Sequence, residues 1–222
     1  QKVYKYYWLL SILPFIRQIS VINSLSIGNV NSESDIDFLV ITNSGFLYFV
    51  RSVIIGVFKI LGVYKTREKI NEQFCFGFYT TSDNLDFTKL LLPQEDPYFA
   101  FWLASLAPIY SQKNYLNLMQ ANGWLKDYFP NFTTDDQLRF IKKENQLVRL
   151  VKTIKEIICF VPAWIIEPVL RKIHIRHTFA LPENHWPSAS TVATKKMLKL
   201  HALDPRKEIR EEFYKTLSAL EF

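Results

Sequence analysis

Two aspartates, Asp35 and Asp37, are the residues of this chain whose type and spacing most directly suggest chemistry. They flank the start of the apolar run IDFLVIT, which predicts a buried β-strand over residues 36–42. Alternate side chains of a strand point to the same face, so the two carboxylates would repel each other unless a cation lies between them. Carboxylate oxygens suit Mg²⁺, whose coordination is commonly completed by water and substrate phosphates. The pair therefore predicts a magnesium site that also takes up a phosphorylated ligand.

The segment before this strand is rich in turn-forming residues. It reads NSLSIGNVNSES, and it places Ser24 and Gly28 in a turn that leads toward a short helical segment. Backbone N–H groups and a hydroxyl in such a turn can hold the phosphates of a nucleotide. We therefore expect the nucleotide to lie against this turn.

The whole segment resembles a known signature. Asn23-Ser24, then Gly28, then Ser34-Asp35-Ile36-Asp37 is similar to the motif of the polymerase-beta-like nucleotidyltransferase superfamily, in which a Gly-Ser pair, a glycine and an Asp-x-Asp occur at this spacing. Asn23 stands where that family usually has glycine. Because asparagine tolerates left-handed backbone geometry best after glycine, we expect the turn to be kept.

The resemblance implies that the protein transfers a nucleoside monophosphate from an NTP to an acceptor and releases pyrophosphate. Asp35 and Asp37 would hold two Mg²⁺ ions, which stabilise the attacking and leaving oxygens. The nucleotide-binding residues would then be Asn23, Ser24, Gly28 and Ser34, and Ser24 would contact the phosphates. The acceptor is left open and includes nucleic acids and small molecules.

A third carboxylate, normally on the next strand of the sheet in that family, would activate the acceptor hydroxyl. The next predicted strand, FCFGFYTT, contains no acid. Glu72 at its entry is our expected third catalytic residue, with Asp83 and Asp86 beyond its end as alternatives. If none of them serves, the chain is a catalytically weak nucleotide-binding or regulatory module that retains the fold.

The composition favours a globular protein. Of 222 residues, 49% are apolar and 15% aromatic, which is enough to fill a core and excludes a disordered chain, while 22% are charged, too many for a polytopic membrane protein. Cys75 and Cys159 lie far apart, so we expect a cytoplasmic protein with neither a disulfide framework nor a zinc site.

Periodicity divides the chain into two parts. A helix over 4–20, a short strand over 21–27, the strand 36–42, an apolar helix within 45–64 and the strand 74–81 predict an α+β nucleotidyltransferase-like domain, with a small mixed sheet and flanking helices, over residues 1–92. Helical spacing then predicts an all-helical domain over residues 93–222, with helices at 97–110, 113–129, 134–161 and 204–220 and a loop over 180–194.

Several residues have a simpler structural interpretation. The net charge of +6 arises entirely after Asp135, which indicates either an anionic partner or a solvated helix face. We favour the solvated face for Lys142, Lys143, Arg149 and Lys152 and a core position for Trp102, Trp124 and Trp164, and we do not expect zinc at His174 and His177. Arg51 and Lys59 interrupt the apolar stretch 45–64, so we favour a buried helix there over membrane contact. A peripheral membrane protein that uses this stretch is the alternative.

Overall fold

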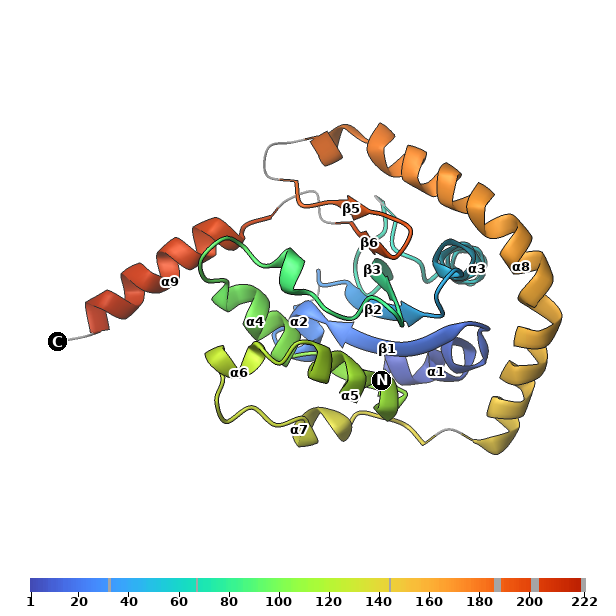
Figure 1. Ribbon diagram of the computed structural model, residues 1–222, viewed down its shortest axis with the longest axis horizontal. Helices are drawn as coiled ribbons and strands as arrows, with labels where there is room; N and C mark the ends of the chain where they lie inside the picture. The colour runs from blue at the N-terminus through green and yellow to red at the C-terminus, as the bar shows by residue number, and fades with distance from the viewer. Residues whose placement is uncertain (32, 67, 144, 186–188, 201–203, 221–222) are drawn as a thin grey trace.

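A mixed six-stranded β-sheet forms the centre of the protein (Figure 1). The computed structural model describes residues 1–222 except positions 32, 67, 144, 186–188, 201–203 and 221–222. The strand order is β4-β1-β2-β3-β6-β5, in which β2 and β3 are parallel and every other neighbouring pair is antiparallel. The strands are β1 (Ile16–Ile22), β2 (Ile36–Thr42), β3 (Phe74–Thr81), β4 (Ala107–Tyr110), β5 (Val192–Ala193) and β6 (Met197–Lys199). The predicted α+β class with a mixed sheet is confirmed.

Helices cover both faces of the sheet, and one long helix wraps around the domain (Figure 1). The long helix is α8 (Gln146–Ala180), which is curved and contains Pro162 and Pro168. The other α-helices are α1 (Lys2–Ile12), α2 (Asn23–Ser26), α3 (Leu47–Ile60), α4 (Pro97–Ala104), α5 (Gln112–Ala121), α6 (Leu125–Tyr128), α7 (Asp135–Leu138) and α9 (Arg206–Leu220). Two short 3-10 helices, η1 (Thr88–Leu90) and η2 (Pro182–His185), lie in connections.

The two faces of β2 supply two separate hydrophobic cores, because side chains alternate along a strand. Phe38 and Val40 belong to the core shared with α1, α3 and α8. Leu39 and Ile41 belong to the core shared with α4 and α5. Asp37 has the same parity as Leu39, so the acidic pair faces the side of the sheet on which α4 lies.

The chain begins differently from the expected helix over 4–20 and strand over 21–27, and both predictions are wrong in their bounds. Helix α1 ends at Ile12, and β1 already begins at Ile16. Pro14 forces the residue before it out of helical geometry, and Leu13 accordingly has an extended backbone. Phe15 then takes a left-handed conformation, with φ of 62°, which turns the chain into the strand.

The all-helical expectation for residues 93–222 is also wrong, because this part contributes three strands to the sheet. The predicted helix over 97–110 is α4 followed by β4, which pairs with β1. The predicted loop over 180–194 ends in β5, and β6 pairs with β3. The two parts inferred from the sequence therefore share one hydrogen-bonded sheet.

The strands at the middle of the sheet were predicted correctly. Residues 36–42 and 74–81 form β2 and β3, and the order helix, strand, strand, helix, strand is confirmed. The stretch 45–64 forms α3, whose inward side chains are buried. Among the helices in the described part of the chain, none is both long and apolar enough to cross a bilayer.

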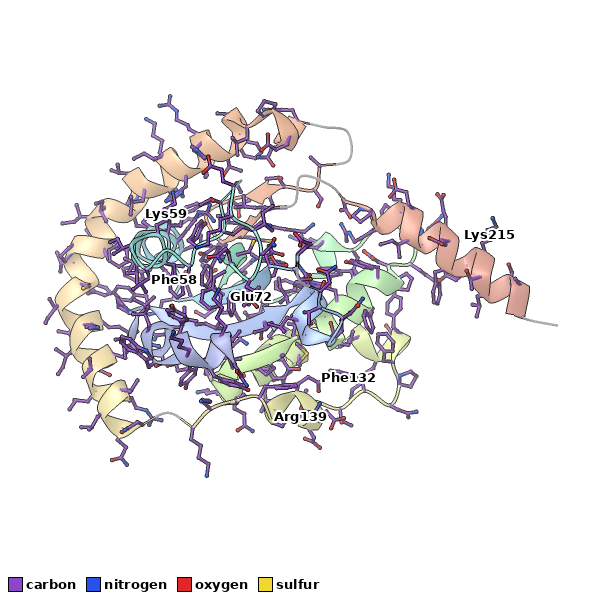
Figure 2. The ribbon with its side chains drawn as sticks, turned by 180° about the vertical axis from the view of Figure 1, so that it is seen from behind. Phe58, Lys59, Glu72, Phe132, Arg139 and Lys215 are labelled. Carbon is purple, nitrogen blue, oxygen red and sulfur yellow. The ribbon has the colours of Figure 1, made fainter. Side chains whose placement is uncertain are left out.

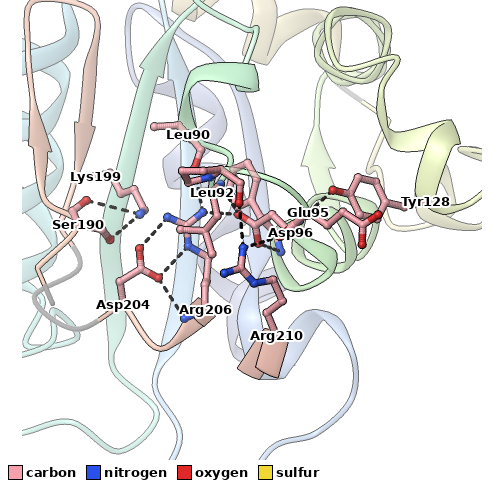
Figure 3. Close-up of polar contacts among 12 residues, drawn as sticks. Leu90, Leu92, Glu95, Asp96, Tyr128, Ser190, Lys199, Asp204, Arg206 and Arg210 are labelled. Atoms are coloured by element: carbon pink, nitrogen blue, oxygen red, sulfur yellow. Dashed lines mark hydrogen bonds and ion pairs between the residues drawn. The ribbon is translucent and has the colours of Figure 1, made fainter. Parts of the chain in front are cut away.

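A buried ion-pair cluster fastens the start of α9 to the segment before α4 (Figure 3). The Arg206 guanidinium donates to Asp96 at 2.7 Å and to the Leu90 carbonyl at 2.8 Å, and it pairs with Asp204 at 2.6 Å. Asp96 is 1% exposed and also caps α4 by accepting from the Phe99 N–H at 3.0 Å. This cluster holds the C-terminal region against the face of the sheet that carries the acidic pair.

Candidate functional site

The acidic pair lies at the entry of β2, where the parallel strand β3 begins beside it. Asp35 precedes β2 by one residue, and Asp37 is paired in register with Cys75 of β3. Ligand atoms of Asp35, Asp37 and Cys75 all lie within 4.8 Å of one another. The structure therefore brings the two predicted aspartates together and adds a thiol to them.

The charges of this cluster are only partly balanced. Lys65, which follows α3, donates to the Asp35 carboxylate at 2.6 Å. Burial and the neighbouring charge of Asp35 raise the pKa of Asp37 above its ordinary value. Burial and the charge of Asp37 likewise raise the pKa of the Cys75 thiol, which is therefore neutral at physiological pH. Two carboxylates on one face with a single lysine against them carry an excess of negative charge, which is the arrangement expected of a cation site.

The donor set fits a hard divalent ion. Carboxylate oxygens are ligands that Mg²⁺ prefers, whereas a protonated thiol is not. Asp35 and Asp37 could hold such an ion if Lys65 moved aside, and its side chain is 37% exposed. A second ion would require an additional carboxylate.

Asn23 links the acidic pair to the opposite helix layer. Its side chain donates to Asp37 at 2.7 Å and accepts from the Trp102 indole N–H of α4 at 2.8 Å. Its φ is 58°, so the left-handed conformation predicted for this position is confirmed. Glycine would permit the same turn but would offer neither hydrogen bond, which explains why asparagine is useful here.

The other predicted nucleotide-binding residues lie in or beside the same loop. Ser24 belongs to α2, directly after β1, and its carbonyl accepts from the Asn29 N–H at 2.9 Å. Gly28 has φ of +73°, a left-handed conformation that glycine adopts without strain. Ser34 bonds through its hydroxyl to Asn31 at 2.9 Å, and its carbonyl accepts from the Glu72 N–H at 2.9 Å.

The structure does not place Glu72 in the acidic cluster. Glu72 has a left-handed backbone with φ of 55°, its side chain is exposed, and its carbonyl accepts from the Lys2 ammonium at 2.6 Å (Figure 2). The expected position for a third carboxylate, beside Asp37 on the next strand, is occupied by Cys75.

The alternative acids lie at the other end of β3. Asp83 and Asp86 follow Thr81, and the eight-residue strand separates them from the acidic pair by about 25 Å. Asp83 pairs with Lys196 at 2.8 Å, and Asp86 accepts from the Thr88 hydroxyl at 2.6 Å. Neither carboxylate can share a cation with Asp35 and Asp37 in this fold.

A small cavity opens beside Asn23 on the α4 side. It measures about 210 Å³, and its lining includes Asn23, Tyr98, Trp102, Lys199 and Arg206. Lys199 bonds to the Ser190 hydroxyl at 2.7 Å (Figure 3), and burial together with the charge of Arg206 lowers the pKa of Lys199 to about 8. Ligand pockets are usually about 300 Å³ or more, so this cavity suits a phosphate or ribose group rather than a whole nucleotide.

Four residues of the site were missed by sequence reasoning: Lys65, Cys75, Trp102 and Lys199. Cys75 lies in a strand that the sequence identified, at a position that only the register of β3 against β2 reveals. Lys199 and Trp102 come from the part of the chain expected to be a separate helical domain. Lys65 carried no signal beyond its place in a charged connection.

The remaining side chains singled out in the sequence have mixed outcomes. Lys152 does not lie on a solvated face, because its ammonium is buried and donates to the Ile16 carbonyl at 2.5 Å and to Tyr110 at 2.7 Å. Trp102 is buried as predicted, whereas Trp164 is 65% exposed and is not a core residue. His174 contacts the Ser52 hydroxyl at 2.8 Å.

Comparisons with known proteins add nothing to these observations. No family model, no curated protein and no solved structure matches the chain significantly.

Proposed function

We propose that the protein is a Mg²⁺-dependent nucleotidyltransferase that transfers a nucleoside monophosphate from an NTP to an acceptor and releases pyrophosphate. The observation that carries the proposal is the juxtaposition of Asp35 and Asp37 at the entry of β2, beside the Asn23–Gly28 turn. The motif resemblance and the order of elements support it, since both place the acids beside a phosphate-binding turn.

Each residue of the site has a definite task in this proposal. Asp35 and Asp37 would hold the ion, which when bound supplies positive charge to the phosphoryl group in transfer. Asn23 keeps the Asp37 carboxylate oriented, because a hydrogen bond from Trp102 fixes Asn23 in turn. Lys65 neutralises Asp35 in the absence of an ion and would turn toward the phosphates when the ion displaces it.

A second candidate function is nucleotide binding without transfer. The observation that favours it is Cys75, which stands where a third carboxylate would activate the acceptor. The chain would then bind Mg²⁺-NTP through the acidic pair and respond to it as a regulatory module. Transfer in this chain depends on whether Glu72 can reach the acceptor when ligands are bound.

The two functions are separated by measuring binding and turnover on the same samples. Calorimetry with each of the four Mg²⁺-NTPs measures binding, and a pyrophosphate assay with candidate acceptors measures transfer. We expect Asp37→Asn to remove both, with turnover falling by at least a hundredfold. Asp83→Asn is the matched control, because it removes a carboxylate that lies at the far end of β3 and should leave both unchanged.

Variants of Glu72 and Cys75 decide between transfer and nucleotide binding without transfer. If Glu72 activates the acceptor, Glu72→Gln should leave NTP binding within about threefold and slow transfer by about a hundredfold. Binding without pyrophosphate release, together with turnover that appears in Cys75→Asp, would favour the regulatory module. Absence of any Mg²⁺-dependent NTP binding would refute both functions.

A further inference from the structure

Helix α8 packs both polar and apolar side chains against the domain, and it leaves many large apolar side chains exposed to solvent. Its buried side chains include Lys152, Glu167 and Thr178. Glu167 accepts from the backbone N–H groups of Tyr48 and Phe49 at 3.1 and 2.7 Å, at the start of α3. Glu156 accepts from Arg17 at 2.7 Å. These polar contacts fasten the helix to the domain along one side.

The opposite side of α8 is an apolar face that projects away from the domain (Figure 2). In the stretch between Leu150 and Val169, the charged side chains are buried or half-buried: Lys152 and Glu167 are buried, and Lys155 and Glu156 are half-buried. This stretch of twenty residues is about 30 Å long. The large side chains of the apolar face, as we define it, are Leu150, Val151, Ile154, Ile157, Ile158, Phe160, Val161, Trp164, Ile165, Ile166 and Val169.

Such a face is unusual on the surface of a soluble protein, where large contiguous apolar patches mark binding sites for proteins or membranes. Ile157 is 71% exposed and Trp164 is 65% exposed. Neither side chain belongs to either hydrophobic core, so the packing of the domain does not explain them.

Charge distinguishes between the partners that could cover this face. Arg149 precedes it, and Arg171, Lys172 and Arg176 follow it. The two acids of α8, Glu156 and Glu167, bond to the domain instead. Both ends of the apolar face are therefore positively charged.

A second copy of the chain fits this charge pattern poorly. Two α8 helices packed in parallel or antiparallel orientation would bring cationic ends together, which is unfavourable. The helix also curves around the domain (Figure 1), and its exposed apolar side chains point outward (Figure 2), so two copies would touch only where they cross. Such a contact falls short of the roughly 800 Å² per partner that stable interfaces bury.

From these observations we infer that the apolar face of α8 binds the surface of a membrane that contains anionic lipids. Amphipathic helices with aromatic and aliphatic side chains on one side and cations beside them lie in the headgroup region in this way. The helix lies on the bilayer rather than spanning it, because the described helices include none suited to cross a membrane. This inference replaces the sequence-based preference against membrane contact, and it does not depend on the proposed catalytic function.

A basic cavity lies between α3 and the C-terminal part of α8. It measures about 780 Å³, and its lining includes Arg51, Lys59, Lys65, Ile173 and His177. Arg51 is 8% exposed, and its Nη1 atom has no hydrogen-bond partner among the described residues. An unpaired guanidinium N–H in a basic cavity is suited to an anionic group such as a phosphate.

Flotation of the full chain with liposomes tests the inference. Vesicles of phosphatidylcholine alone are compared with vesicles that also contain phosphatidylserine. We expect the wild type to float with the anionic vesicles and much less with the neutral ones. Trp164→Glu should weaken this binding by about 10- to 100-fold, the range for exposing one large apolar side chain. Neutralising Lys172 and Arg176 with glutamine should weaken it by about fivefold per cation.

The matched control is Phe213→Glu on α9, which lies on the other side of the molecule from α8 (Figure 1). Phe213 is 47% exposed, so this change adds the same charge at a similarly exposed aromatic residue and should not affect flotation. Circular dichroism checks that each variant is folded. Sedimentation velocity measures the oligomeric state of the same samples.

Two results would overturn the inference. One is a wild type that is folded but does not float with anionic vesicles at low salt. The other is a stable dimer that Trp164→Glu dissociates, which would assign the apolar face to a second copy of the chain.

Discussion

Replacing Asp37 by asparagine should make the ligand-free protein more stable. The ligand atoms of Asp35 and Asp37 lie within 4.8 Å, so at an effective dielectric constant of about 20 their repulsion is about 3 kcal/mol or more. Lys65, at 2.6 Å from Asp35, offsets part of this repulsion. Asparagine is isosteric and its oxygen can still accept from Asn23. We therefore expect the free energy of unfolding to rise by about 1–2 kcal/mol.

The pH dependence of this gain has a definite sign. The pKa of Asp37 is raised in the folded state, so the folded protein binds a proton more readily there than the unfolded chain does. Stability from this group is therefore lost as the pH rises from 3.8 through the raised pKa, and the loss remains at neutral pH. The advantage of Asp37→Asn over the wild type should be small near pH 4 and full at pH 7.

Urea denaturation at several pH values, with and without Mg²⁺, measures these effects. Mg²⁺ at ten times its dissociation constant should stabilise the wild type by about 1.4 kcal/mol and should not stabilise the variant. Asp35→Asn serves as the control, because it removes the same repulsion but also breaks the ion pair with Lys65, so its net effect should be near zero. If Asp37→Asn instead destabilised the protein at pH 7, the carboxylate would have a structural role and the argument for a cation site would be wrong.

Three further predictions concern buried polar groups, two of them beside the cavity next to Asn23 and one bonded to the segment that follows β3. Arg206→Met should lower the free energy of unfolding by about 3–5 kcal/mol in urea, because it leaves the buried Asp96 carboxylate unpaired; a loss below 1 kcal/mol would contradict the cluster in Figure 3. The free energy of unfolding of the wild type, relative to that of Lys199→Met, should rise by about 1–3 kcal/mol as the pH rises from 8 to 10.5. The reason is that Lys199 has a lowered pKa in the folded protein and loses its proton there at a lower pH than in the unfolded chain. A difference that does not change with pH would indicate that the pKa of Lys199 is not lowered. Asn122→Ala should lower the free energy of unfolding by about 2–4 kcal/mol, since the fully buried Asn122 side chain accepts from the Phe87 N–H at 2.8 Å and donates to two carbonyls. Thermal denaturation measures this loss, and an almost unchanged melting temperature would mean that solvent replaces these hydrogen bonds.

The sequence was most informative where the local pattern alone decides the structure. Strands β2 and β3 were predicted with their observed bounds, because a continuous apolar run indicates β2 and aromatic side chains at every second position indicate β3. The left-handed conformation of Asn23 was also predictable, since it depends on the turn itself.

Features that depend on partners far along the chain were not predictable in this way. The segment APIY looks like the end of a helix, and it forms β4 only because β1 offers a free edge. Lys152 appears solvated in the sequence, and it is buried because the Ile16 carbonyl and Tyr110 lie beneath it. Cys75 lies in the site because the register of β3 against β2 pairs it with Asp37, and periodicity in the sequence does not predict the register between strands.

The position of β6 beside β3 has a consequence for how the chain folds during synthesis. About 115 residues separate the two strands, so at about 5–20 residues per second β6 emerges about 6–23 s after β3. Until then one edge of a strand rich in phenylalanine has no partner, and such edges readily pair with other chains. Helix α8 is made within this interval, so its exposed apolar face accompanies the open edge. A nascent chain that ends after α8 but before β6, between residues 180 and 197, therefore exposes two aggregation-prone surfaces at once.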